Sequence, residues 1–388
     1  MKIIYYSTAY YASHGGSNHS KSFVECASRN TDVQELSVFP AMGMIKKPMV
    51  QSVVAGGTLA TILRKSGFAA IFRFFRRSKF YLNELVNEIE KLKPDAIVIR
   101  LDSNFVQVRK LKQKFPTLIV VTEVNASPFD ESFKRISFRP FFRALERRHL
   151  SRADVNFFVS KTLRSKIMKS RSSDQRDLLL INGVDTSLFS PTRDKRKSKR
   201  DLALPEHKKI VGYVGTLDIM KRMDVLLEAF NRLHAVRTDI YFVIIGDGPE
   251  FNNVREQRNR DGLQDCLLLT GNIPHNTVPA YLQAFDLAIH HAANDYMCPL
   301  KLFEYLAAGV PVIGPNTPAV KEVFEEGKHL FLCQPEATDI VQKIISCLDN
   351  LPQLDEMIQN GMALVKEKYT WQRNADTVIS TIKSRMSQ

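Results

Sequence analysis

Short apolar segments alternate with amphipathic helical patterns along the whole chain, and this alternation limits the fold more than any other feature of the sequence. Parallel strands that helices cover on both faces read as near-continuous runs of Val, Ile and Leu, and the runs here have that character. The pattern therefore predicts an α/β protein with parallel sheets. The expected strands begin with KIIYYS at Lys2 and continue at 95–101, 118–125, 155–160, 177–182, 209–215, 241–246, 267–271, 287–291, 310–314 and 329–333.

A polar, basic and proline-flanked segment separates the strands into two series. It begins after Gly183 and reads DTSLFSPTRDKRKSKRDLALPEHKK. Because 388 residues are enough for two domains, we expect an interdomain linker here, with one domain at 1–190 and another at 191–368. Each series predicts a doubly wound, Rossmann-like sheet that binds ligands outside the carboxyl ends of its strands. Two such domains would face each other across a cleft.

The cysteines indicate a reducing compartment. They are odd in number, scattered and without CxxC spacing, which disfavours a disulfide framework or a zinc site; they are Cys26, Cys266, Cys298, Cys333 and Cys347. The opening run MKIIYYSTAYYASHGG is too short and too polar for a signal peptide, and no segment approaches a membrane span. The expected location is cytoplasmic.

The excess of positive charge lies in the first half of the chain. Residues 1–190 hold 31 Lys and Arg against 16 Asp and Glu, whereas the remainder holds 24 against 25. This asymmetry predicts an acidic surface or ligand that meets the first half; a general effect on solubility is the alternative. Nucleic acid is disfavoured as the partner, because the basic segments lack a recognisable binding motif.

Two segments of the first half interleave Arg with Phe. They are 64–77 and 133–143, with Arg147 and Arg148 beyond the second. Aromatic side chains beside basic ones are typical of helices that lie in the headgroup region of an anionic membrane. We therefore predict that the N-terminal domain is peripheral at the inner face of the cell membrane. The alternative is that the phenylalanines pack inward and the arginines are simply solvated.

The segment 299–313 carries the strongest single indication of a ligand site. Pro299 suits a helix start, and Gly309 before Val-Pro-Val-Ile indicates a helix end that leads into a buried strand. Backbone N–H groups at such a start, together with Lys301, favour a phosphate, and Glu304 one turn deeper can accept hydrogen bonds from sugar hydroxyls. A buried Glu304 also requires a partner, because an unpaired buried charge is costly.

Five motifs occur in the order and spacing of one enzyme family. They are Ile181-Asn182-Gly183-Val184-Asp185 with Phe189 and Pro191, Gly215-Thr216-Leu217 through Lys221, Ile245-Gly246-Asp247-Gly248-Pro249, Leu269-Thr270-Gly271-Asn272-Ile273, and FEYLAAGVPVI. Together they resemble the nucleotide-sugar-dependent glycosyltransferase family 4, retaining enzymes of the GT-B fold. The form Pro-Leu-Lys-Leu-Phe-Glu-Tyr resembles a bacterial polysaccharide-assembly branch of that family. The resemblance also implies a C-terminal helix, 369–388, that packs back on the N-terminal domain.

The resemblance and the strand ends together indicate site residues. Lys221, Glu304 and Asn125 would be catalytic, and the residues that bind the donor would be Gly15, Gly16, Thr216, Gly246, Asn272, Ile273, Tyr296, Pro299, Leu300, Lys301 and Leu302. Three positions depart from the family's pattern. Tyr296 replaces the first glutamate of the signature, Thr216 replaces a phosphate-binding arginine, and Asn125 replaces a histidine near the donor sugar. These departures concern the sugar contacts more than nucleotide binding.

The implied reaction is transfer of a hexose-type unit, with retained anomeric configuration, from a UDP- or GDP-sugar to a lipid-linked or glycan acceptor in cell-surface polysaccharide assembly. Bond cleavage builds negative charge on the leaving phosphate, which Lys221, Lys301 and backbone N–H groups would stabilise without a metal. We expect no cofactor. We interpret His290 and His291 as one packing ring and one ring near the cleft mouth, in preference to metal ligands. The alternatives are a nucleotide-sugar epimerase or hydrolase on the same fold, and a non-catalytic nucleotide-sugar-binding protein.

Overall fold

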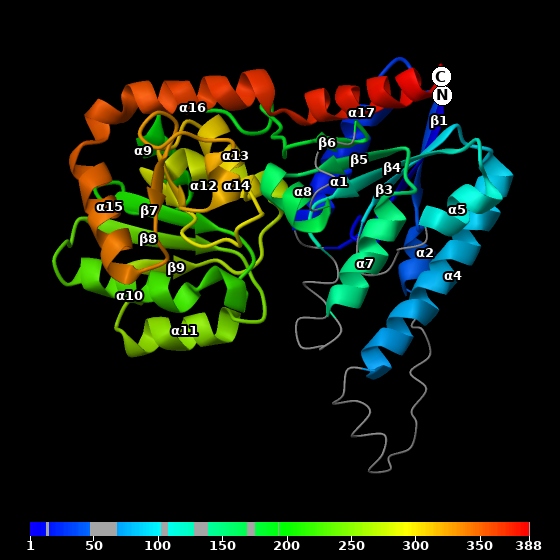
Figure 1. Cartoon of the computed structure of the whole chain (residues 1–388). Coiled ribbons are helices and arrows are strands. Elements are labelled where there is room, and N and C mark those ends of the chain that lie inside the picture. The colour runs from blue at the N-terminus through cyan, green and yellow to red at the C-terminus, as the bar shows by residue number, and fades with distance from the viewer. Residues whose placement is uncertain are drawn as a thin grey trace, which may run out of the picture. The chain divides into compact units, whose positions relative to one another are not determined.

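The computed structural model describes residues 1–12, 15–46, 68–101, 108–127, 139–168, 175–192 and 194–387. They form two compact units, Met1–Ile181 with Ala375–Gln388 and Asn182–Asn374 (Figure 1). Each unit contains a six-stranded sheet whose neighbouring strands all run parallel. The predicted α/β class with two Rossmann-like domains is therefore confirmed.

The sheet of the first unit has the strand order β2-β1-β3-β4-β5-β6. The strands are β1 (Lys2–Tyr6), β2 (Glu35–Phe39), β3 (Ala96–Arg100), β4 (Ile119–Val124), β5 (Val155–Phe158) and β6 (Asp177–Leu179). The apolar runs predicted five of them. The pattern missed β2, because this edge strand buries only Phe39 fully and so lacks the continuous apolar run of its neighbours.

Helices cover both faces of this sheet. On one face, α1 (Gly15–Ser28) and α17 (Trp371–Met386) share a hydrophobic core with the strands, to which α17 contributes Ala375, Val378, Ile379 and Ile382. On the other face, Tyr6 of β1 meets the ring of Tyr81 in α4 (Phe68–Leu92) edge to face. The remaining helices are α2 (Met42–Lys46), α5 (Val108–Lys114), α7 (Arg139–Leu150) and α8 (Lys161–Met168).

The sheet of the second unit has the order β12-β11-β10-β7-β8-β9. Its strands are β7 (Lys209–Val214), β8 (Ile240–Ile245), β9 (Leu267–Leu269), β10 (Leu287–Ile289), β11 (Val312–Pro315) and β12 (Phe331–Cys333). The chain order reverses between β7 and β10, which are neighbours in the sheet. In doubly wound sheets such a switch point opens a crevice at the carboxyl ends of the strands, where ligands bind. We therefore expect a ligand site at the loops after β7 and β10.

The helices of the second unit lie on both sides of its sheet. Figure 1 shows α10 (Met223–His234) and α11 (Phe251–Arg260) on one side and α12 (Val278–Ala284) and α13 (Leu300–Ala307) on the other. In the core, Phe230 of α10 stacks on Phe242 of β8 with 4.0 Å between ring centroids. The unit also contains α9 (Lys195–Asp201), α14 (Pro318–Lys321), α15 (Ala337–Asp349), α16 (Asp355–Lys368) and the 3-10 helices η2 (Ile219–Lys221), η3 (His275–Thr277) and η4 (Leu351–Leu354).

The basic segment that we expected to link the domains is folded onto the second unit. It contains α9, where the Lys199 side chain is buried and its Nζ donates to Asp286 Oδ2 at 2.7 Å and to the Lys208 carbonyl at 2.8 Å. The boundary accordingly falls between Ile181 and Asn182, before the expected position at 190. The run of Lys and Arg looks fully solvated in the sequence, although one of its members forms a buried ion pair.

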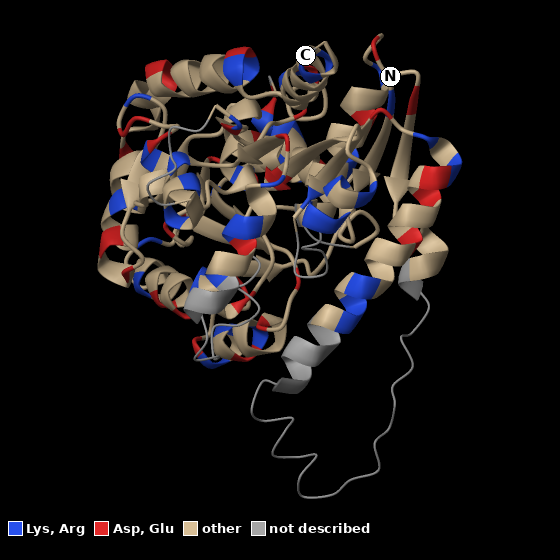
Figure 2. Ribbon diagram, turned by 45° about the vertical axis from the view of Figure 1, so that its right-hand side comes forward, with Lys and Arg blue, Asp and Glu red and all other residues tan. Residues whose placement is uncertain are grey.

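Charged side chains are numerous on the helices of the first unit. Figure 2 shows consecutive Lys and Arg on α4, which carries Arg76, Arg77 and Lys79 in its described part. Within the described ranges, no helix combines the length and the apolar character that crossing a bilayer requires.

Candidate functional site

The loops that follow β7, β8 and β9 are joined backbone to backbone. Leu217 N donates to the Asp247 carbonyl at 3.0 Å, and Gly246 N donates to the Gly271 carbonyl at 3.0 Å. A Cβ atom at Gly246 would lie 1.9 Å from the Gly215 carbonyl oxygen, so only glycine permits this approach. The three loops therefore form one surface at the carboxyl edge of the sheet. It carries four of the predicted donor-binding residues, namely Thr216, Gly246, Asn272 and Ile273.

Helix α13 begins at this same edge. Pro299 is its extended N-cap residue, and Gly309, with φ of +69°, follows its end in the left-handed conformation. The helix is fixed to β7 by Tyr305, whose hydroxyl accepts from Val214 N at 2.8 Å. Leu302 is fully buried, whereas Leu300 and Lys301 in the first turn are partly exposed. The first N–H groups of a helix have no partner within it, so this start can bind an anion.

Glu304 lies between two basic side chains. Its Oε2 accepts from Lys301 Nζ at 2.6 Å, and its Oε1 lies 3.1 Å from His275 Nε2. Burial opposes ionisation of Glu304, but the Lys301 charge and the His275 hydrogen bond outweigh it and lower the pKa of the carboxyl group below its ordinary value. Glu304 is therefore a carboxylate at neutral pH. Each oxygen can still accept a further hydrogen bond from a ligand.

Sequence reasoning missed His275. This residue begins η3, after β9, and its ring lies 5.5 Å from that of Phe189 between centroids. The only local signal is a histidine in the polar run after Leu269-Thr270-Gly271-Asn272-Ile273, and that position does not show that Glu304 is its partner. The contact depends on how α13 packs against the β9 loop.

Lys221 ends the 3-10 helix η2 in the loop after β7. The Asp218 side chain caps this helix by accepting from Met220 N at 2.8 Å, and the Asp218 carbonyl accepts from Lys221 N at 2.9 Å. Lys221 and Lys301 are both close enough to His290 to lower the pKa of its ring further, although burial is the main cause of its low pKa. The structure thus places Lys301 and Glu304 in direct contact after β10 and Lys221 in the loop after the neighbouring strand β7.

The two histidines after β10 are both buried. The ring of His290 stacks on Tyr213 with 5.4 Å between centroids, and His291 Nε2 lies 3.0 Å from the Arg222 carbonyl oxygen. His290 thus packs against β7 and His291 against the loop that follows it. The expected position of one ring near a cleft mouth stays a prediction. Within the part of the chain that the structure describes, no group of three or more His, Cys, Asp or Glu side chains is placed to hold a metal ion.

Tyr296 is the residue that we expect at the position of the first signature glutamate. This residue is only 6% exposed, so its side chain packs into the protein in the loop before α13. Its neighbour Asp295 is exposed and fixes the loop through its backbone carbonyl, which accepts from Ala319 N at 3.1 Å.

The remaining predicted residues lie in the first unit. Gly15 and Gly16 begin α1, and Asn125 follows β4, with its side-chain Nδ2 buried and without a hydrogen-bond partner among the described residues. Glu123, two residues before Asn125, is 2% exposed. It accepts from the Tyr5 hydroxyl at 3.0 Å and lies 3.3 Å from His19 Nε2. Glu123 is therefore paired with a tyrosine and a histidine at the carboxyl edge of the first sheet.

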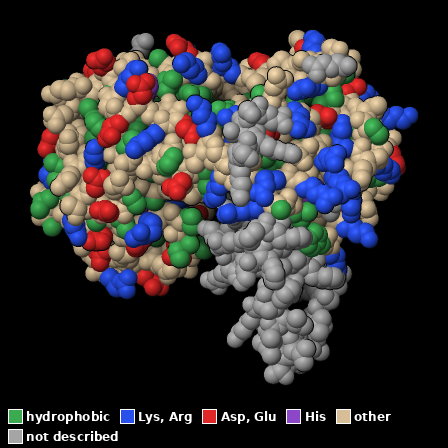
Figure 3. Space-filling view, in the orientation of Figure 1, with side chains coloured by type: hydrophobic (Ala, Val, Ile, Leu, Met, Phe, Trp, Pro, Cys, Tyr) green, Lys and Arg blue, Asp and Glu red, His purple; other side chains and the backbone are tan. Residues whose placement is uncertain are grey.

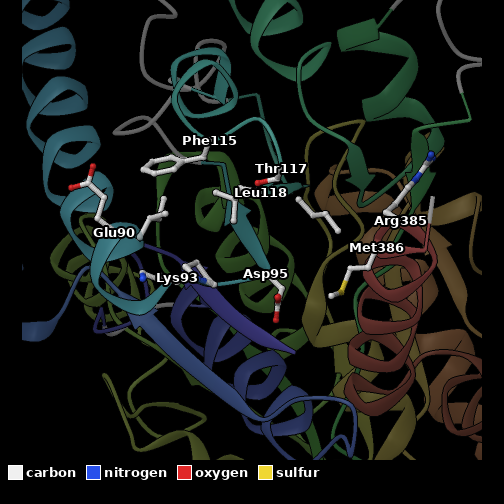
Figure 4. A pocket seen from close by; sticks show the side chains of 11 residues that line it. Glu90, Lys93, Asp95, Phe115, Thr117, Leu118, Arg385 and Met386 are labelled. Atoms are coloured by element: carbon white, nitrogen blue, oxygen red, sulfur yellow. The ribbon is translucent and has the colours of Figure 1, made fainter.

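A separate pocket of about 700 Å³ lies at the opposite, amino edge of the first sheet (Figure 4). The ends of α4 and α17 line it with Glu90, Lys93, Arg385 and Met386, and the starts of β3 and β4 line it with Asp95 and Ile119. Two of its acidic groups are already paired: Glu90 with Lys114 at 2.7 Å and Asp95 with Lys2 N at 2.7 Å. The pocket contains none of the predicted site residues.

Comparisons with known proteins give a family match for part of the chain. The family model for glycosyl transferases group 1 matches residues 194–363. The chain is 26% identical over 223 residues to the lipopolysaccharide core biosynthesis mannosyltransferase LpsB of Rhizobium meliloti (strain 1021), which covers 55% of this chain and 62% of the relative. It is 23% identical over 242 residues to the N-acetyl-alpha-D-glucosaminyl L-malate synthase of Bacillus anthracis. That match covers 62% of this chain and 61% of the relative. The chain thus spans less than two thirds of the length of these relatives.

Solved structures match the whole chain in fold. Anabaena Alr3699/HepE in complex with UDP and glucose gives a TM-score of 0.75 at 15% identity and covers 99% of this chain and 100% of that chain. Sucrose-phosphate synthase from Thermosynechococcus elongatus gives a TM-score of 0.78 at 16% identity, and the match covers 100% of this chain and 99% of that chain. At this identity the likeness establishes the fold alone, and the predicted GT-B fold is confirmed.

Proposed function

Residues 194–363 belong to the glycosyl transferases group 1 family, and from this premise we propose that the chain is a retaining hexosyltransferase. It takes a sugar from a nucleotide-sugar donor and transfers it to a glycan acceptor in cell-surface polysaccharide assembly. The observation that carries the proposal is the group formed by Lys301, Glu304 and His275 beside Lys221. This group joins cations that suit a diphosphate to a carboxylate that suits sugar hydroxyls.

The chemistry follows from where charge develops. As the anomeric bond breaks, negative charge grows on the leaving diphosphate, and Lys221, Lys301 and the N–H groups at the start of α13 can stabilise it. Glu304 is ionised and held in place from both sides, so it can accept hydrogen bonds from the donor ribose. We propose that these groups act without a divalent metal.

UDP is the nucleotide that we propose for the donor. The solved HepE structures contain UDP, UDP with glucose, and UDP-glucose, which supports this choice for a chain of the same fold. A thermal-shift screen over UDP-, GDP- and ADP-sugars tests it, because a ligand that binds the folded protein raises its melting temperature. We expect UDP-sugars to give the largest increase. A larger increase with GDP-sugars would correct the nucleobase and leave the enzyme class intact.

The proposed acceptor is lipid-linked, and the first unit would meet it at an anionic membrane surface on the cytoplasmic side. On α4, Phe75, Arg76, Lys79 and Phe80 are exposed at positions that share one helical face, whereas Ser78 and Leu82 are buried. Figure 3 shows Lys and Arg gathered on the first unit. Residues 64–67 and 133–138 of the two predicted segments lie outside the described residues, so α4 carries the argument.

The names of the relatives point to similar acceptors. They include a lipopolysaccharide core mannosyltransferase, a phosphatidylinositol N-acetylglucosaminyltransferase and an alpha-monoglucosyldiacylglycerol synthase. Incubation with UDP-sugar, with and without lipid extract, tests transfer. We expect a sugar-labelled lipid only when the extract is present. Sugar release or epimerisation without extract would favour a hydrolase or an epimerase, and neither product would favour a binding protein.

A further inference from the structure

The backbone turn that follows Lys221 is strained. Arg222 has φ of 46° and ψ of 48°, which is the left-handed conformation that a side chain with a Cβ rarely adopts. Its own side chain does not explain the conformation, because its guanidinium is half exposed and pairs with Asp224, only two residues on. Something else must hold Arg222 in this turn.

The constraint comes from the Arg222 carbonyl. Its oxygen accepts from Val225 N at 3.0 Å and from Leu226 N at 3.3 Å, the first hydrogen bonds of α10. The same oxygen lies 3.0 Å from Nε2 of His291, which is fully buried at the end of β10. A carbonyl can only accept, so Nε2 of His291 carries the hydrogen. This bond crosses the switch point from β10 to the loop after β7.

His291 stays neutral while it makes this bond. Burial, with the nearby Lys221 and Arg222 charges, lowers the pKa of the ring to about 4, even though the bond to Arg222 and the Asp224 charge oppose the shift. The same hydrogen-bond donor is therefore present throughout the neutral range.

We propose that His291 is a positioning residue for transfer, which holds Arg222 in its left-handed turn and so presents Lys221 to the diphosphate of the donor. The proposal rests on the function proposed above for Lys221. Without the bond from His291, only the two hydrogen bonds from the start of α10 hold the Arg222 carbonyl. Arg222 then relaxes toward an ordinary conformation, and the preceding residue changes direction. The loss falls on turnover more than on nucleotide binding, because the charge that Lys221 meets is largest in the transition state.

A double-mutant cycle tests the proposal. His291→Met removes the donor at similar side-chain length, and His291→Gln keeps an N–H donor within reach of the carbonyl. Arg222→Gly supplies a residue that adopts the left-handed turn without strain. We expect His291→Met to lower kcat by about tenfold or more, up to the roughly hundredfold cost of a misplacement of about 1 Å, and His291→Gln to lower it by much less. In the Arg222→Gly background the cost of His291→Met should fall to about threefold or less.

Each other outcome has a defined meaning. An equal cost of His291→Met in both backgrounds, or an equal loss with Gln and Met, shows that His291 only packs and overturns the proposal. If the methionine variant does not fold, His291→Asn replaces it, because its shorter amide also fails to reach the carbonyl. If the unsubstituted chain binds no UDP and transfers no sugar, the proposed function itself fails, and this result is separate from any result of the cycle.

Discussion

At the scale of single residues, the candidate site depends on a carboxylate whose partners are known. Glu304 is buried and faces Lys301 on one oxygen and His275 on the other. We expect Glu304→Gln to weaken UDP binding by about 1.5 to 3 kcal/mol, the contribution of a hydrogen bond to a charged group. Isothermal titration measures this change.

The matched control for Glu304 is Glu325→Gln, since Glu325 is exposed and pairs with Lys328. It should leave UDP affinity unchanged. If Glu304→Gln also leaves the affinity unchanged and instead lowers the melting temperature strongly, Glu304 is a structural carboxylate and has no role in the donor site.

Lys221 should act on the reaction more than on binding. The negative charge on the diphosphate grows as the bond to the sugar breaks, so a cation that meets it stabilises the transition state preferentially. We expect Lys221→Ala to reduce kcat by about a hundredfold and to change the UDP dissociation constant much less. Lys328→Ala, at an exposed site, is the control. Equal effects on kcat and affinity would show that Lys221 only binds the ground state.

The metal independence of transfer is a separate prediction. If Lys221, Lys301 and the start of α13 neutralise the diphosphate, a chelator has no ion to remove from the reaction. We expect initial rates in EDTA to equal those in buffer with Mg²⁺ or Mn²⁺. Loss of activity in EDTA that either ion restores would contradict this part of the mechanism.

At the scale of elements, the sequence predicts what depends on buried apolar runs. Eleven of the strands in the described structure were expected because each reads as a short apolar run, and the central strands, such as those that contain Ile97 and Val211, are buried on both faces. The family resemblance is likewise confirmed, and the matched residues 194–363 contain four of the five motifs. The close approach of Gly246 to Gly215 shows why the backbone fixes the residue type in one of them. The edge strand β2 was missed because most of its side chains are partly or fully exposed, so its sequence is not a continuous apolar run.

The sequence did not predict which polar side chains pair across long distances along the chain. His275 and Glu304 are 29 residues apart, and Lys199 and Asp286 are 87 apart. A lysine that will be solvated and one that will be buried look the same in a basic run. Only the packing of α9 on the second unit separates Lys199 from its neighbours.

The Lys199 ion pair gives a prediction for α9. Lys199→Met leaves Asp286 buried with the more exposed Lys195, at 3.6 Å, and with Ile210 N. Removal of one partner of a buried pair costs about 3 to 5 kcal/mol, and we expect the lower end here because these two contacts persist. Urea unfolding measures the change.

Lys197→Met, on the same helix, is the control for this substitution. Lys197 forms an exposed pair with Asp201, and such a pair contributes about 1 kcal/mol or less. If the two substitutions destabilise the protein equally, the buried pair is not what fixes α9 to the second unit.

At the scale of the whole molecule, the positive charge is concentrated in the first half of the chain, and this asymmetry predicts an acidic partner. The 31 Lys and Arg of residues 1–190 outnumber the 16 Asp and Glu and attract acidic surfaces, but charge alone does not distinguish a membrane from other polyanions. We propose that the exposed Phe75 and Phe80 beside Arg76 and Lys79 favour a membrane, because transfer of an aromatic ring from water into the interface of a bilayer is favourable.

We therefore expect the chain to sediment with phosphatidylglycerol vesicles at low salt and to be released as salt screens the attraction. Phe75→Ser with Phe80→Ser should weaken vesicle binding by about tenfold, since two partly exposed rings no longer become buried, and should leave UDP binding unchanged. Val236→Ser is the matched control, because Val236 is 68% exposed in the second unit. Equal recovery in the supernatant with anionic vesicles, neutral vesicles and no vesicles would exclude the membrane surface and favour a soluble glycan acceptor. Salt-sensitive binding that the phenylalanine substitutions do not change would instead show that the arginines act alone.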